Sequence, residues 1–109
     1  MKFLIKSRSS ENEYAVHVYE TDDGPVITCD CPAAENGQYC KHRLALISGD
    51  ERDVIEADTP VSAVANLVEG SRLKAAIDAM HKQEAAVKKA QTELRALKKS
   101  VANAMLGRY

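Results

Sequence analysis

The chain has 109 residues, with 15 Lys and Arg against 16 Asp and Glu, a formal net charge of −1, three Cys and no Trp. This length predicts one small domain, or a small domain with an appendage. Hydrophobic residues make up 45% of the chain but aromatic residues only 5%, so we expect a thin core that needs a metal or a partner for stability. These values argue against a deep enzyme pocket and against a uniformly basic nucleic-acid binder.

No apolar run approaches the roughly 20 residues that a membrane span needs. The apolar run within residues 1–6 is also too short for a signal peptide. We therefore expect an intracellular, cytoplasmic protein that does not engage a membrane. Three Cys without a secretory signal argue against a disulfide framework.

The first half is predicted to form a small antiparallel sheet followed by a short helix. β-branched and aromatic residues suit strands, and the turn sequence at residues 22–25 favours a hairpin. The expected strands are residues 2–7, 14–20 and 26–28. Residues 41–48 are predicted to form a short helix that ends at Gly49.

The second half is predicted to be helical. Residues 50–58 are acidic and are interpreted as a linker. Thr59 and Pro60 are favourable residues for a helix start, and Gly70 marks a stop. Nothing interrupts a helix from residue 72 to about 106, a length of about 52 Å at 1.5 Å per residue.

The long helix carries a heptad repeat of apolar residues, which indicates a coiled coil. A single apolar stripe of this length needs a partner helix, most simply from a second copy, so we expect a homo-oligomer, with a dimer as the simplest form. The alternative is an intramolecular hairpin against the preceding short helix. The predicted oligomerisation seam contains Leu73, Ala76, Met80, Val87, Ala90, Leu94, Leu97 and Val101, with Gln83 and Ala104 at the remaining d positions.

The three Cys and one His form two short pairs, Cys29-Asp30-Cys31 and Cys40-Lys41-His42. In an extended segment, residues two apart point to the same side, so Cys29 and Cys31 can face one point. Residues two apart in a helix interior diverge, so Cys40 and His42 can converge only where the chain enters the helix. A helix N-terminus also favours the thiolate form.

Three thiolates and one imidazole suit one tetrahedral Zn²⁺. The set is complete without water or substrate, so the sequence predicts a structural rather than a catalytic site. An iron–sulfur cluster usually requires four Cys. The alternative without a metal is three buried thiols and a surface His42, which would leave the paired spacing unexplained. Structural zinc contributes on the order of 10–16 kcal/mol, comparable with the stability of a small domain.

The Cys-x-Cys and Cys-x-His pairs, preceded by a hairpin and opening a helix, resemble the SWIM zinc finger over about residues 14–49. The resemblance implies a ββα finger that holds one zinc ion. It also implies nucleic-acid or protein binding, without deciding between them. Members of the family usually form part of larger chains, whereas here the motif precedes a long helix.

Charge divides unevenly along the chain. Residues 1–70 hold 6 basic and 13 acidic side chains, a net −7, and residues 71–109 hold 9 basic and 3 acidic, a net +6. The long helix therefore offers a basic stripe for nucleic acid or an acidic partner, unless it is simply a solvated exterior or faces the acidic first half. The candidate stripe comprises Lys74, Lys82, Lys88, Lys89, Arg95, Lys98 and Lys99.

Together these observations predict an α+β fold: a small ββα finger, with a hairpin or a three-stranded meander, followed by a short helix and a long coiled-coil helix. The expected division is a finger at residues 1–49, a linker at 50–58 and a helical region at 59–109. We expect a non-enzymatic zinc-binding adaptor that self-associates and binds a protein. The alternative is a DNA- or RNA-binding protein. No catalytic residue is predicted.

Overall fold

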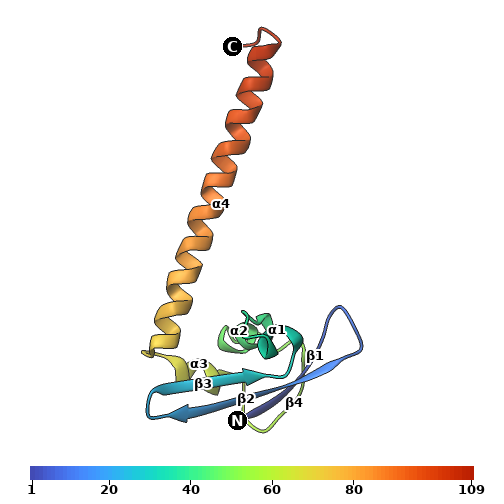
Figure 1. Ribbon diagram of the computed structural model, residues 1–109, viewed down its shortest axis with the longest axis vertical. Coiled ribbons are helices and arrows are strands. Elements are labelled where there is room, and N and C mark those ends of the chain that lie inside the picture. Colours follow the sequence, from blue (N-terminus) through green and yellow to red (C-terminus); the bar gives the residue numbers. More distant parts are fainter. The chain divides into compact units, whose positions relative to one another are not determined.

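The computed structural model describes the whole chain, Met1–Tyr109, as two compact units, Met1–Lys74 and Ala75–Tyr109. The first unit contains a four-stranded antiparallel sheet of order β3-β2-β1-β4 and three short helices (Figure 1). The strands are β1 Lys2–Lys6, β2 Glu13–Thr21, β3 Gly24–Cys29 and β4 Val54–Ala57. The helices are α1 Pro32–Glu35, α2 Lys41–Ile47, α3 Ser62–Val68 and α4 Arg72–Met105.

The sheet buries one face because apolar residues alternate along its strands. The strand register places Phe3, Val16 and Cys29 side by side across β1, β2 and β3, and all three are buried. His17, which follows Val16 and points to the opposite face, is exposed. Helices α1 and α2 lie over the sheet in the view of Figure 1, and the core cluster joins Leu46 of α2 to the sheet residues.

The predicted linker at residues 50–58 is wrong, because its second half forms β4. This strand pairs antiparallel with β1, with Ala57 opposite Phe3 and Glu56 opposite Leu4. Only Val54 of this strand packs against the core as a partly buried side chain. Pairing of an edge strand is made by backbone N–H and C=O groups, so an acidic sequence with one core-facing residue can still complete the sheet.

The predicted domain boundary before residue 59 is also wrong. Val61, Val64 and Val68 are buried in the same core cluster as Phe3 and the sheet residues. The apolar face of α3 therefore packs into the core of the finger-containing unit. Leu73 packs against this core as well, so its side chain is used within the first unit and not in a seam between helices.

Helix α4 spans 34 residues, about 51 Å at 1.5 Å per residue, which confirms the predicted long helix. Several large apolar side chains of the predicted seam are exposed on it, among them Leu94 at 52%, Leu97 at 63% and Val101 at 54%. Neither α4 nor any other helix is both long enough and apolar enough to cross a membrane. The predicted α+β fold is confirmed, with β4 added to the β1–β2–β3 meander.

Candidate metal centre

The four predicted ligands come together at one point of the first unit. The ligand atoms of Cys29, Cys31, Cys40 and His42 all lie within 4.8 Å of one another. Cys31 Sγ lies 3.4 Å from Cys40 Sγ, and His42 Nδ1 lies 3.6 Å from Cys40 Sγ and 4.0 Å from Cys29 Sγ. The three thiols are buried and unoxidised, so the cluster is shielded from water on most sides.

Extended backbone brings the first pair into position. Cys29 ends β3 and Cys31 follows in an extended conformation, with φ −68° and ψ 157°. Asp30 between them turns away from the cluster, because its Oδ1 accepts a hydrogen bond of 2.9 Å from the backbone N–H of Ala15. This bond anchors the end of β3 to β2 and leaves both sulfurs on the same side of the chain.

The second pair straddles the start of α2, as the sequence predicts. Cys40 is extended, with φ −124° and ψ 117°, and immediately precedes the helix. His42 is the second residue of α2 and is partly buried. The change of backbone conformation at Lys41 therefore allows side chains two residues apart to converge, which a continuous helix would prevent.

The eight residues between the pairs contain a short helix that the sequence analysis missed. Helix α1 begins at Pro32, where the ring's fixed φ suits the first helical position. It ends before Gly37, which has a φ of +71°, a conformation that favours glycine at the end of a helix. Proline followed five residues later by glycine was the available signal. This compact turn returns the chain from Cys31 to Cys40.

The donor set and its spacing fit one zinc ion. Zinc–sulfur bonds of about 2.3 Å at tetrahedral angles separate two sulfurs by about 3.8 Å. The Cys31 and Cys40 sulfurs are 3.4 Å apart, slightly closer than that value. The same geometry separates sulfur and nitrogen by about 3.6 Å, close to the 3.6 and 4.0 Å between His42 Nδ1 and the sulfurs of Cys40 and Cys29. Soft thiolates exclude Mg²⁺ and Ca²⁺ as preferred ions. The four residues are therefore positioned to hold one structural Zn²⁺, with no coordination position left for a substrate.

Burial and the start of α2 set the protonation of the metal-free donors. Burial raises the pKa of Cys29 to about 12, so this thiol is protonated at neutral pH. Burial also tends to raise the pKa of Cys40. Hydrogen bonds from the backbone N–H groups of Arg43 and His42, and from the neighbouring thiols, outweigh this effect and lower the pKa below its usual value. Burial lowers the pKa of His42, and Lys41 adds to this effect, so the imidazole is neutral and able to coordinate. Zinc binding must therefore release protons and weaken as the pH falls.

Two residues that the sequence analysis did not assign to the site hold it in place. The Tyr14 ring lies 5.2 Å from the His42 ring, centroid to centroid, in a tilted arrangement. Arg43 donates from Nη1 to the carbonyl of Ile27 at 3.2 Å and from Nη2 to the carbonyl of Gln38 at 2.9 Å. Arg43 thus joins α2 to β3 and to the segment that precedes Cys40. No sequence pattern indicates these contacts, because they join residues 5 to 28 positions apart.

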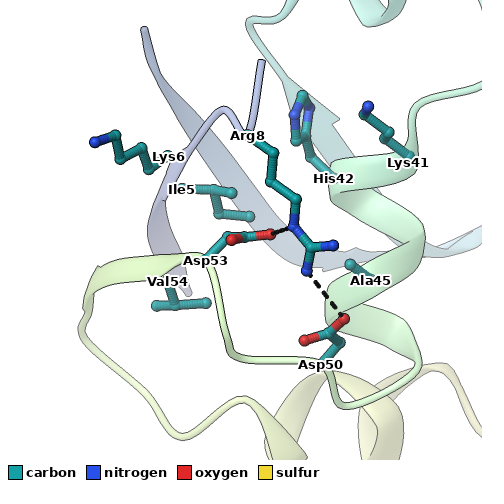
Figure 2. Close-up of a pocket in the computed structure, with 9 residues that line it drawn as sticks. All are labelled: Ile5, Lys6, Arg8, Lys41, His42, Ala45, Asp50, Asp53 and Val54. Carbon is teal, nitrogen blue, oxygen red and sulfur yellow. Dashed lines mark hydrogen bonds and ion pairs between the residues drawn. The ribbon is translucent and has the colours of Figure 1, made fainter. Parts of the chain in front are cut away.

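An arginine that bridges two carboxylates lines a pocket beside His42. Figure 2 shows Arg8 reaching between Asp53 and Asp50, with His42 and Lys41 on the far side. Arg8 Nε donates to Asp53 at 2.6 Å, and its Nη2 lies 3.9 Å from Asp50. Hydrogen bonds from Arg52, and then the charge of Arg8, hold the pKa of Asp50 below its usual range. The side chains are partly exposed, so these pairs position the segment that precedes β4 more than they stabilise it.

The other predicted functional residues do not join the metal centre. Lys74 is partly buried at the end of the first unit. The other stripe residues are exposed on α4, in the second unit; they are Lys82, Lys88, Lys89, Arg95, Lys98 and Lys99. Among the seam residues in this unit, Met80 is partly buried. The exposed ones are Ala76, Val87, Ala90, Leu94, Leu97 and Val101.

Comparison with known proteins agrees with this geometry. Residues 14–48 match the family model of the SWIM zinc finger, so the match covers 35 of the 109 residues. No curated protein and no solved structure matches the chain significantly. The match begins at Tyr14 of β2, includes all four metal donors and ends just after α2. The segment formed by residues 14–48 is therefore a SWIM-type zinc finger.

Proposed function

We propose that this protein is a non-enzymatic, zinc-binding adaptor that self-associates through α4 and presents its finger unit to another protein. The observation that carries the proposal is the apolar stripe of α4, which is exposed over much of its length in the single chain. A helix that exposes Leu and Val side chains at heptad spacing is only marginally stable in water. Packing against a second apolar surface removes these side chains from water and stabilises the helix.

A binding role suits the metal centre better than catalysis does. Four protein side chains lie close enough together to occupy all four coordination positions of a tetrahedral ion, which would leave no position for an activated water or a substrate. Thiolate ligands persist in a reducing compartment, which supports an intracellular, cytoplasmic location. The unit Met1–Lys74 carries 8 basic and 13 acidic side chains, a balance that repels phosphate backbones and favours a protein partner.

Self-association can be tested by light scattering on the zinc-loaded chain. We expect a dimer for the wild-type chain and at least about 100-fold weaker association for Leu97→Glu, because each of two copies loses a buried leucine and gains a charge. The matched control is Ala96→Glu, which places the same charge one residue away, outside the seam, and should remain dimeric. A wild-type chain that stays monomeric at high concentration would contradict self-association.

The basic stripe supports nucleic-acid binding as a second candidate function, because six of its side chains are exposed along one helix. If six phosphates were neutralised, the logarithm of the association constant for duplex DNA would fall with the logarithm of salt concentration with a slope near −5. Replacing Lys88 and Lys89 by Gln should reduce that slope by about 2. Fluorescence anisotropy measures both, and no binding at low salt would remove this candidate.

A further inference from the structure

The structure limits which residues of α4 are available to pair with a second copy. Because Leu73 packs in the core of the first unit, the seam that remains available begins beyond the first turn of the helix. Its a positions then carry Met80, Val87, Leu94 and Val101, all of them large. Its d positions are Ala76, Gln83, Ala90, Leu97 and Ala104, and three of these five are Ala.

This alternation of size distinguishes the two possible helix orientations. In a parallel in-register pair, each a residue faces its own copy and each d residue faces its own copy. Layers of two large side chains would then alternate with d layers, three of which would consist of two alanines. Each gap the size of a methyl group costs about 1 kcal/mol. In an antiparallel pair, each a residue faces a d residue of the other helix, so each alanine of the seam can lie opposite a large side chain.

One antiparallel register uses the available seam without the first turn. With Met80 opposite Ala104 of the second copy, Val87 lies opposite Leu97 and Leu94 lies opposite Ala90, and Val101 lies opposite Gln83. No layer then consists of two alanines. The residues that would face Leu73 and Ala76 lie beyond Met105, the end of α4, which agrees with the use of Leu73 inside the first unit.

The flanking charges do not decide between the two orientations. Glu84 and Lys98 lie on the same edge of the seam and face each other across the pair, twice by symmetry. On the other edge, Glu93 faces its own copy, which is a repulsive pair of like charges. In a parallel pair Glu93 would instead lie beside Lys98 of the other copy, which is an attractive pair. Exposed pairs of this kind contribute only about 0.3–0.5 kcal/mol each, less than the gaps of the Ala–Ala layers, so side-chain size decides the orientation.

We propose that α4 pairs with α4 of a second copy as an antiparallel coiled coil with Met80 opposite Ala104. This inference rests on the proposed self-association and specifies its geometry. Each finger unit precedes its own α4, so in this register the two starts of α4 lie at opposite ends of the coil, about 60 Å apart along the axis. Such a dimer presents two fingers to separate sites on a large partner and gains avidity from both.

Two variants of the zinc-loaded full chain, each with one added cysteine and treated with a short bis-maleimide, separate the orientations. Glu93→Cys should cross-link into a dimer, because this position faces its own copy at the centre of the antiparallel coil. Val101→Cys should cross-link no more than the wild-type chain does, because the two copies of this position lie far apart in the antiparallel coil. The wild-type chain measures any reaction of the three native thiols.

The outcomes are distinguishable. Cross-linking of Val101→Cys, alone or together with Glu93→Cys, overturns the proposed geometry while leaving self-association intact. No cross-linking of either variant, with dimers still present in light scattering, overturns this register. Monomers in light scattering overturn self-association itself, and the geometry with it.

A charge-reversal pair provides a second measurement that needs no added cysteine. Glu84→Lys should weaken dimerisation at least about threefold, since two attractive pairs are lost, and adding Lys98→Glu should restore it. Failure of the second change to restore association overturns the antiparallel register.

Discussion

Removal of zinc is expected to unfold the whole unit from Met1 to Lys74, and not only the matched segment of residues 14–48. The four donors join β3 to α2, and one core cluster joins both to β1 and α3. Zinc binding contributes on the order of 10–16 kcal/mol in small zinc domains, which equals or exceeds the total stability of a typical domain. Without the metal, this small core cannot offset the entropy of ordering the chain.

The measurement is the dispersion of amide signals in an NMR spectrum, recorded with zinc, after treatment with a chelator and after zinc is added back. Cys31→Ser should give the collapsed spectrum even in the presence of zinc. His17→Ala is the control, since His17 is exposed on the opposite face of the sheet and its loss should change neither zinc content nor dispersion. A metal-free chain that keeps a dispersed spectrum would contradict the structural role of zinc.

Phe3→Ala is expected to destabilise the same unit by about 3–5 kcal/mol, the usual cost of removing a buried aromatic side chain. Phe3 has no exposed surface and lies outside the matched segment. It pairs with Val16, which pairs with Cys29 on the next strand. The cavity left by the ring therefore opens beside the strand that positions the first metal donor, and zinc should be lost to a chelator at lower concentration.

Leu4→Ala is the matched control, because Leu4 is the next residue of β1 and points to the opposite, partly exposed face. Leu4→Ala should lower the free energy of unfolding clearly less than Phe3→Ala does. Denaturant unfolding of the zinc-loaded chain measures both values. Equal resistance to chelator in Phe3→Ala and the wild-type chain would show that the core outside the finger motif does not support the metal centre.

The metal centre could be predicted from the sequence because its geometry is local. Cys29 and Cys31 needed only extended backbone, and Cys40 and His42 needed only the start of a helix. The contacts of Tyr14 and Arg43 could not be predicted, since they depend on how β2, β3 and α2 pack. The strand at residues 54–57 was missed for a related reason: its pairing partner, β1, lies about 50 residues earlier in the chain.

The sequence by itself determined the ligand set, the zinc-finger motif and the long helix, because ligand spacing and helical periodicity are properties of neighbouring residues. Tertiary structure decided where the finger unit ends. Backbone pairing drew β4 into the sheet despite its acidic composition, and burial of Val61, Val64 and Val68 drew α3 into the same core. The inclusion of β4 and α3 depends on which apolar faces are left uncovered once the sheet forms, and no local pattern of residues contains that information.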